Sequence, residues 1–229
     1  MADIRARVID FKSDSHTTHG YLAEPVDERD HPGLVIIQEW WGLVPHIKDV
    51  AERLGREGFI VLAPDLYYGK SSEEPDEARK LAMSLDRDRA VAEIDAAAQF
   101  LNGMPRVRPK KIGVVGWCMG GGLALSTAAR SPLVGATVAF YGRPLSEEDT
   151  ARIASPVLGL YAEKDHGIPT TAVRDFEAAL QKARVPHEIH IYPGAAHAFF
   201  NDARPEAYNR SAAEDAWTRT LSWLRAYLV

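Results

Sequence analysis

The sequence contains one cysteine among its 229 residues, Cys118. A single cysteine excludes an intramolecular disulfide, so the cysteine content gives no sign of an oxidising compartment. The sequence also lacks an apolar run of the roughly 20 residues that a membrane-spanning helix needs. Its first residues carry charge where a signal peptide would have an apolar core. We therefore expect a cytoplasmic protein that has no membrane partner.

A strong excess of charge is missing as well. The formal net charge is −5, and the basic residues are scattered along the chain, which gives no reason to expect a nucleic-acid partner. The one short basic cluster, residues 106–111, is interpreted as a solvated loop that leads into a strand. With 46% hydrophobic and 26% charged residues, the composition is typical of a globular protein that can form a large core.

Short apolar runs alternate with segments of helical periodicity along most of the chain. This alternation predicts a mainly parallel sheet with helices on both faces, in a single α/β domain that covers residues 1–229. The first two strands, at residues 4–11 and 18–23, are expected to form a hairpin at one edge of the sheet. Further strands are expected at residues 34–37, 59–63, 112–115, 136–141, 157–161 and 188–192. Helices are expected around residues 47–54, 78–85, 91–101, 122–129, 173–180 and 213–228.

The cysteine lies between an expected strand and an expected helix, in the sequence Gly-Trp-Cys-Met-Gly-Gly at residues 116–121. This sequence has the form of the nucleophile elbow G-x-S-x-G, with sulfur in place of the serine oxygen. Gly116 and Gly120 stand two residues either side of Cys118, where the helix must pass close to the strand and a Cβ atom would clash. Because the helix N-terminus behind the thiol favours negative charge, Cys118 is predicted to be a nucleophile.

A thiol nucleophile needs a base and a third group that orients the base. In hydrolases built on such an elbow, the acid and then the histidine follow the nucleophile along the chain. Asp165 lies in the loop after the strand at residues 157–161, and His197 lies in a Gly/Ala-rich loop after the last strand. Both loops follow the C-terminal ends of strands, where such sheets build their sites. Glu163, in the same loop as Asp165, is the nearest competitor for the role of the acid.

The loop after the strand at residues 34–37 reads Gln-Glu-Trp-Trp-Gly. In the same class of hydrolase, this loop supplies one N–H group of the oxyanion hole. We assign that group to Trp40 and the second one to Met119, because both would face the charge that develops on a carbonyl oxygen. Glu39, next to a thiol, is predicted to accept its proton or to move away when substrate enters. Of the Trp40 and Trp41 side chains, one is expected in the core and one on the pocket wall.

Taken in order, four motifs resemble those of dienelactone hydrolases (carboxymethylenebutenolidases). They are Gln38-Glu39 followed by Gly42, the Gly-x-Cys-x-Gly-Gly elbow, Asp165 before Pro169, and Gly-x-x-His-x-Phe ending at Phe199. The resemblance extends over nearly the whole chain and implies an α/β-hydrolase fold with a mainly parallel eight-stranded sheet. It also implies ester or lactone hydrolysis by a Cys-His-Asp triad that uses no cofactor. In that family, the glutamate that matches Glu39 holds the resting thiol and takes its proton when substrate arrives.

The expected substrate contacts depart from the family pattern. Family members that act on dienelactone hold its carboxylate with arginines, one of which stands at the place occupied here by Asn201. Arg204 is near this place but out of register, and either Arg79 or Arg87 matches a second family arginine. For Tyr141, core packing is as good an interpretation as contact with substrate. The candidate substrate-binding residues are Trp41, Tyr141, Arg79, Arg87, Phe199, Asn201 and Arg204.

These residues predict an enzyme that hydrolyses small carboxylic esters or lactones through a covalent acyl-thiol intermediate. Two alternatives fit the same residues: another acyl-transfer reaction on the same triad, such as thioester hydrolysis, or a non-catalytic ligand-binding module. No cofactor is expected. No metal site is expected either, because His187 and His190 are three residues apart on a strand and would point to opposite faces. We expect a monomer or a small homo-oligomer whose partner is a small-molecule substrate.

Overall fold

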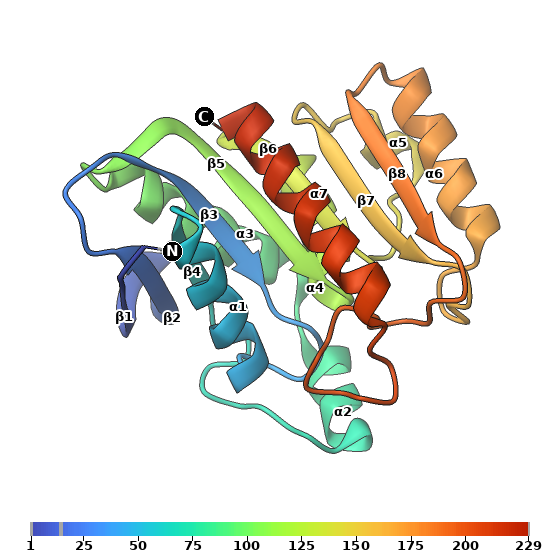
Figure 1. Cartoon of the computed structure of the whole chain (residues 1–229), viewed down its shortest axis with the longest axis horizontal. Helices are drawn as coiled ribbons and strands as arrows, with labels where there is room; N and C mark the ends of the chain where they lie inside the picture. The colour runs from blue at the N-terminus through green and yellow to red at the C-terminus, as the bar shows by residue number, and fades with distance from the viewer. Residues whose placement is uncertain (1, 14–15, 229) are drawn as a thin grey trace.

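The computed structural model of the chain describes residues 2–13 and 16–228. The strands are β1 (Ile4–Ser13), β2 (His16–Pro25), β3 (His31–Ile37), β4 (Ile60–Pro64), β5 (Val107–Trp117), β6 (Val134–Phe140), β7 (Val157–Ala162) and β8 (His187–Tyr192). They form one sheet with the order β1-β2-β4-β3-β5-β6-β7-β8 (Figure 1). β2 pairs antiparallel with β1 and with β4, and the other neighbouring strands are parallel.

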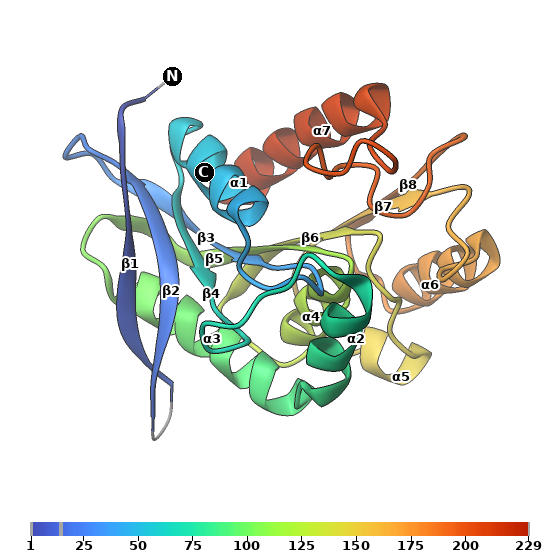
Figure 2. The same cartoon turned by 90° about the horizontal axis from the view of Figure 1, so that it is seen from below.

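The helices lie on both faces of this sheet. They are α1 (Pro45–Arg56), α2 (Pro75–Ser84), α3 (Arg87–Gly103), α4 (Met119–Ala128), α5 (Glu147–Thr150), α6 (Thr170–Lys182) and α7 (Arg210–Leu228). α1 and α7 cover one face, and α3, α4 and α6 cover the other (Figure 2). The predicted fold class, a mainly parallel sheet between two layers of helices, is therefore confirmed. Within the described ranges, none of the helices is both long and apolar enough to cross a bilayer.

Each face of the sheet has its own apolar core. Leu34 and Ile36 of β3 pack on the side of α1 and α7, whereas Val35 and Ile37 pack on the side of α3 and α4. Successive side chains of a strand point to opposite faces, so a strand that is covered on both sides needs apolar residues at every position. This requirement explains the continuous apolar run in the sequence and fixes where β3 ends, which in turn places the loop that follows it.

The expectation for residues 106–111 is wrong, because β5 already begins at Val107. Val107 is buried and pairs with His31, whereas the next four residues are exposed. The register of the pairing then shifts before Gly33 meets Ile112. Because the exposed residues are Arg, Pro, Lys and Lys, this part of the strand lacks the apolar run that identifies a buried strand in a sequence.

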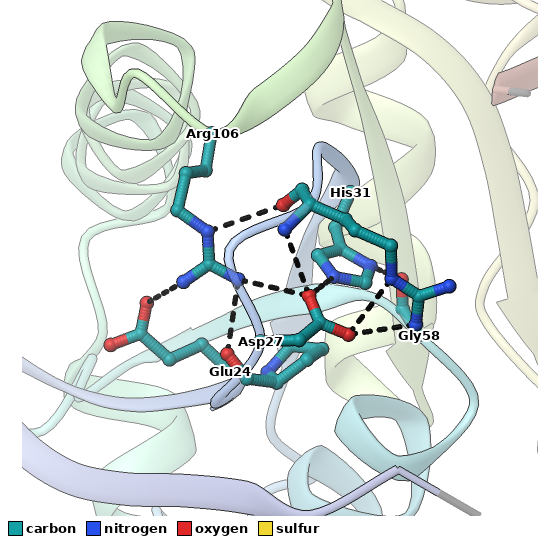
Figure 3. A network of polar contacts seen from close by, with 7 residues as sticks. Glu24, Asp27, His31, Gly58 and Arg106 are labelled. Atoms are coloured by element: carbon teal, nitrogen blue, oxygen red, sulfur yellow. Dashed lines mark hydrogen bonds and ion pairs between the residues drawn. The ribbon is translucent and has the colours of Figure 1, made fainter.

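A polar network fastens the end of β2 to the starts of β3 and β5 (Figure 3). Asp27 lies 2.8 Å from His31 Nε2 and accepts a 2.7 Å hydrogen bond from Arg29, while His31 Nδ1 lies 2.8 Å from the Gly58 carbonyl oxygen. Arg106 Nη2 is 3.6 Å from Asp27. Arg29 and then His31 hold the pKa of Asp27 well below its usual range. Because the network lies at the N-terminal ends of the parallel strands, its role is to join the sheet's elements.

Candidate active site

The candidate residues meet at the C-terminal edge of the parallel strands. The loops after β3, β5, β6, β7 and β8 carry Glu39, Cys118, Tyr141, Asp165 and His197, respectively. Because the carboxyl ends of parallel strands share one edge of a sheet, five loops that are far apart in the sequence deliver polar side chains to one place. The fold thus brings together the four residues predicted to be catalytic.

Cys118 stands in a strained turn between β5 and α4. Its backbone has φ +55° and ψ −117°, a conformation that a residue with a Cβ atom rarely adopts. Its N–H donates a 3.0 Å hydrogen bond to the Phe140 carbonyl oxygen, and its side chain is half-buried. Cys118 is also the N-cap of α4, whose first N–H groups favour an anion. The thiol is therefore accessible and lies at the N-terminus of a helix.

Two glycines allow α4 to pack closely against β5 and against the end of β3. A Cβ atom on Gly120 would lie 2.4 Å from the Ile37 carbonyl oxygen and 2.5 Å from that of Gln38. A Cβ atom on Gly116 would lie 2.0 Å from the Gly120 carbonyl oxygen. The contacted atoms are backbone, so they cannot move aside as a flexible side chain would. The steric reason predicted for both glycines is confirmed.

The variant Gly120→Ala is expected to lower the free energy of unfolding by about 3 kcal/mol, because the added methyl overpacks against backbone. Gly122→Ala is the matched control in the same helix. Its Cβ atom would come no closer than 3.5 Å to Arg143, and alanine stabilises a helix interior by about 1 kcal/mol relative to glycine. Urea unfolding of both variants makes the comparison. Equal stability of the two variants would contradict the steric account.

Asp165 orients His197. The His197 Nδ1 atom lies 2.5 Å from Asp165 Oδ2, and Asp165 Oδ1 accepts hydrogen bonds from the N–H groups of Gly167 and Ile168 at 2.8 and 3.1 Å. The Asp165 side chain is 2% exposed. Burial raises the pKa of Asp165, but His197 and the two N–H groups outweigh burial and leave the pKa below its usual value. A fixed negative charge thus stands behind the imidazole.

The pKa of His197 is shifted in the opposite direction from that of Asp165. Burial lowers the pKa of His197, but the hydrogen bond to Asp165 and the neighbouring Cys118 outweigh burial and raise the pKa to about 10. With Nδ1 bonded to Asp165, Nε2 is the ring nitrogen left for the thiol. Glu163, the competing acid, is exposed and accepts a 2.7 Å hydrogen bond from the Gly194 N–H instead. The structure therefore pairs His197 with Asp165 and not with Glu163.

Two backbone N–H groups next to the elbow are free to bind an anion. Among the described residues, the N–H groups of Trp40 and Met119 donate no hydrogen bond to a protein acceptor. Met119 is the first residue of α4, so its N–H has no helical acceptor. Trp40 comes two residues after Gln38, whose carbonyl oxygen lies against the first turn of the same helix at Gly120. Both groups therefore belong to the same small region, as an oxyanion hole requires.

Glu39 is 1% exposed and is held by two neutral donors. The Tyr141 hydroxyl donates to Oε1 at 3.3 Å, and Asn201 Nδ2 donates to Oε2 at 2.6 Å. The Tyr141 ring centroid lies 4.9 Å from that of His197, which places Glu39 beside the histidine. Burial raises the pKa of Glu39, and the charge of His46, followed by the Asn201 hydrogen bond, opposes this rise without cancelling it. The protonated form of Glu39 is therefore favoured more than that of a solvent-exposed glutamate.

Trp41 and Arg204 form a rim next to this carboxyl group. The Arg204 guanidinium carbon lies 3.5 Å from the Trp41 ring centroid, a cation–π contact. Both side chains line a cavity of about 490 Å³ together with Asn201 and His46. Trp41 is buried and still lines this cavity, whereas Trp40 is half-buried and is not part of its lining.

Three of the predicted substrate-binding residues are not brought to the thiol. Phe199 is fully buried and packs in the core with its ring centroid 5.3 Å from that of Tyr141. Arg79 is exposed on α2 and lies 3.9 Å from Asp76. Arg87 is exposed at the first residue of α3. Of the three, Phe199 packs against Tyr141, and the two arginines lie on the protein surface.

Two residues next to the site were not identified from the sequence. The Tyr67 hydroxyl donates to Met119 Sδ at 3.4 Å, and burial followed by the charge of Cys118 raises the pKa of Tyr67. Tyr67 follows β4 at the same edge of the sheet, and this position was a signal that could have identified it. His46 lies in the first turn of α1 and lines the same cavity as Asn201. No motif around His46 in the sequence indicates that it lies next to the site.

This combination of fold and residues has relatives among known proteins. Residues 18–228 match the model of the family described as the dienelactone hydrolase family. The chain belongs to the dienelactone hydrolase family. It is similar to the protein Usf of Aquifex pyrophilus, with 35% identity over 230 residues that cover 97% of this chain and 99% of that protein. It is also 32% identical, over 97% of this chain and 99% of the other, to an Aquifex aeolicus protein with the inferred name carboxymethylenebutenolidase.

A solved structure supports the same conclusion. The crystal structure of a Klebsiella pneumoniae protein, titled by inference as a dienelactone hydrolase, superposes with a TM-score of 0.91 and 29% identity. The match covers 98% of this chain and 100% of that chain. The resemblance seen in the sequence is confirmed, and this member of the dienelactone hydrolase family is a carboxylic ester hydrolase of the carboxymethylenebutenolidase type.

Proposed function

We propose that the protein hydrolyses small carboxylic esters or lactones through a triad of Cys118, His197 and Asp165, with a covalent acyl-thiol intermediate. The observation that carries the proposal is the position of His197, whose Nδ1 atom lies 2.5 Å from the buried Asp165 and whose pKa is raised by Asp165 and by the neighbouring Cys118. A nucleophile, a base and a group that orients the base are the parts that covalent acyl transfer needs. The family supplies the substrate class.

Acylation begins with attack of the Cys118 thiolate on the carbonyl carbon. The Trp40 and Met119 N–H groups bind the oxygen as it becomes negative. When the tetrahedral intermediate collapses, the carbon–oxygen bond breaks and the leaving alkoxide takes a proton from His197 Nε2. In a lactone, the new hydroxyl group stays attached to the acyl chain, so nothing leaves the site at this step.

Deacylation returns the enzyme to its starting state. His197, now neutral, takes a proton from a water molecule whose oxygen attacks the thioester carbon. Collapse of the second intermediate breaks the carbon–sulfur bond and releases the carboxylic acid and the Cys118 thiolate. Asp165 keeps the ring oriented and stabilises its charged form in both steps. One water is consumed for each ester bond cleaved, and no other reactant is needed.

Glu39 has a separate role in generating the nucleophile. If Cys118 is a thiol at rest, its proton must leave before attack, and the nearby carboxylate is a suitable acceptor because its pKa is raised by burial. Tyr141 and Asn201 keep the carboxylate in place. Glu39 then holds the thiol proton through the cycle and returns it to the Cys118 sulfur after the carboxylic acid has left, while His197 supplies the proton that the leaving group takes.

Trapping of the intermediate tests the proposal. The protein is mixed with an activated ester of a bulky acid, quenched in acid during turnover, and analysed by peptide mass spectrometry. We expect one acyl group on the peptide that contains Cys118. Turnover without an adduct on that peptide, or an adduct on another residue, would contradict the proposal. Rates on a matched oxygen ester and thioester separate ester hydrolysis from thioester hydrolysis.

Arg204→Met is expected to raise KM about tenfold for an ester that carries a free carboxylate, and to change KM little for a neutral ester of the same shape. Arg204 is the arginine that stands beside Trp41 on the cavity of about 490 Å³, and a hydrogen bond to a charged group is worth about 1.5–3 kcal/mol. Arg79→Met is the control, because Arg79 is exposed and paired with Asp76. Equal changes for the two esters would reject the role of Arg204.

A further inference from the structure

Tyr67 is a buried residue that the proposed mechanism does not use. It lies three residues after the end of β4 and is 5% exposed, whereas the next residue, Tyr68, is 44% exposed. The Asp65 carboxylate fixes this turn, because its two oxygens accept hydrogen bonds from the N–H groups of Tyr67 and Gly69 at 3.1 and 2.7 Å. The turn therefore sends one tyrosine side chain into the protein and leaves the other at the surface.

The Tyr67 side chain lies between the elbow and a cavity. Its hydroxyl donates to Met119 Sδ at 3.4 Å, and Met119 is the residue that directly follows Cys118. Tyr67 also lines a cavity of about 200 Å³ between the end of α2 and the start of α3, whose lining contains neither Met119 nor Cys118. One side chain therefore contacts the neighbour of the nucleophile and forms part of the wall of a cavity that the nucleophile does not reach.

The buried part of the cavity wall is apolar. Leu66 and Ala90 are each 1% exposed, and Leu81 and Leu85 are half-buried and pack against the same apolar core as Met119. The exposed residues of the lining are Tyr68, Lys70, Ser84, Asp86 and Arg89. A cavity of this size holds several methylene groups, since one water molecule takes up about 30 Å³ in the liquid, and apolar surface is favourably buried there. The cavity therefore suits an alkyl chain.

The order of the strands places this cavity on the acyl side of the site. Tyr67 follows β4 and His197 follows β8, and these two strands lie on opposite sides of β5, which leads to the nucleophile (Figure 1). In the proposed reaction the leaving group takes its proton from His197 and so departs on the β8 side. The acyl group stays bonded to the sulfur and is left to occupy the β4 side.

We propose that Tyr67 is a specificity-determining residue whose ring closes the apolar cavity to the acyl group and so limits the substrate to esters and lactones of short-chain acids. The inference rests on the proposed function, because an acyl group is bonded to Cys118 only if Cys118 is the nucleophile. The ring acts by its bulk, and its hydroxyl fixes it against Met119. A longer alkyl chain has no space at the elbow unless the ring is removed.

Alkylation of the single thiol tests the closed path without depending on turnover. The rates at which Cys118 is modified by iodoacetamide and by N-octyl iodoacetamide are measured in the wild type and in Tyr67→Ala. We expect the ratio of the long-reagent rate to the short-reagent rate to rise at least about tenfold in Tyr67→Ala, because the octyl chain then enters the cavity. Tyr68→Ala is the matched control: Tyr68 lines the same cavity, but its hydroxyl donates to Glu93, so its loss leaves the path closed.

Hydrolysis supplies the second readout. The ratio of kcat/KM for an activated octanoate to that for the matching acetate should also rise at least about tenfold in Tyr67→Ala. Tyr67→Leu covers the case in which the alanine variant does not fold, because leucine fills part of the buried space but is too short to reach Met119. Tyr67→Phe keeps the ring and should keep the wild-type ratio, which separates the bulk of the side chain from its hydroxyl group.

The outcomes separate this proposal from the proposed function. Long-to-short ratios that are the same in the wild type and in a folded Tyr67→Ala or Tyr67→Leu overturn the proposal. An equal rise in Tyr68→Ala overturns it as well, because the path would then not be closed by Tyr67. A labelling ratio that rises only in Tyr67→Ala and Tyr67→Leu, in a protein that hydrolyses neither ester, supports the closed path and rejects the proposed function. Hydrolysis of both esters with unchanged ratios rejects the role of Tyr67 and leaves the proposed function standing.

Discussion

Cys118→Ala is expected to lower turnover of an activated ester by at least about 10⁴-fold, because no other group on the elbow can form the acyl bond. The free energy of unfolding should change by less than about 1 kcal/mol, because the side chain is small and half-buried. Alanine keeps the Cβ atom, so the strain of the positive φ at this position is retained. Steady-state kinetics and urea unfolding of the same preparation measure both effects.

Cys118→Gly extends the test to the backbone. Glycine adopts φ +55° without penalty, and relief of strain in such a turn is worth on the order of 1 kcal/mol. This variant should therefore be as inactive as Cys118→Ala but more stable. Turnover by either variant at the wild-type rate would remove Cys118 as the nucleophile. If Cys118→Ala fails to fold, the thiol itself is needed for stability, which would contradict the expected small change in the free energy of unfolding.

Asp165→Asn is expected to lower kcat/KM by about 10³ to 10⁴-fold, because the amide no longer holds His197 in the tautomer that leaves Nε2 free to accept a proton. The side chain is buried against the N–H groups of Gly167 and Ile168, so the shape of the loop should be kept. Glu163→Gln, in the same loop but bonded to Gly194, is the matched control and should retain activity. Similar losses in both variants would contradict the assignment of the acid.

The stability difference between the wild type and Asp165→Asn is expected to depend on pH. Folding raises the pKa of His197 from 6.5 to about 10, so its charged ring contributes fully below pH 6.5 and loses this contribution as the pH rises through about 10. Folding lowers the pKa of Asp165 from 3.8, so its contribution is present above pH 3.8 and is lost on acidification. The stability advantage of the wild type over Asp165→Asn should be greatest between pH 3.8 and 6.5 and shrink toward pH 10. An advantage that does not change over this range would contradict the pairing.

Much of the fold follows from local sequence patterns. The parallel strands are buried on both faces, and this burial requires the continuous apolar runs that identify them, such as residues 34–37. The start of β5 could not be predicted in this way, because its side chains at residues 108–111 are exposed and form no apolar run. α5 could not be predicted either, because a helix of four residues is too short to show a helical repeat.

The nucleophile and its partners were predictable for a different reason. A sharp strand-to-helix turn has steric requirements that appear in the sequence as Gly116 and Gly120. The acid and the histidine then follow in a fixed order along an α/β chain. Asp165 and His197 could therefore be proposed without knowledge of their distance, and the structure places them 2.5 Å apart.

The surroundings of Glu39 could not be predicted in the same way. Asn201 and His46 come from a loop and a helix that are 155 residues apart in the sequence, and only the folded chain shows that they share a cavity. The same holds for the arginines that were candidates for binding a substrate carboxylate. The family pattern left Arg79, Arg87 and Arg204 open, and only the structure shows that Arg204 stands beside Trp41. Contacts made by side chains across loops depend on tertiary packing, which leaves no local period or spacing in the sequence.

The most direct test of the central claim is a titration of hydrolysis against labelling of the thiol. The protein contains one cysteine, so iodoacetamide can place at most one thiol label on each chain. The rate on a small activated ester is measured as labelling proceeds, and the label is located by peptide mass spectrometry. The account predicts that the rate falls in proportion to the labelled fraction and vanishes when Cys118 is fully modified. Full modification of Cys118 with the rate unchanged would contradict it.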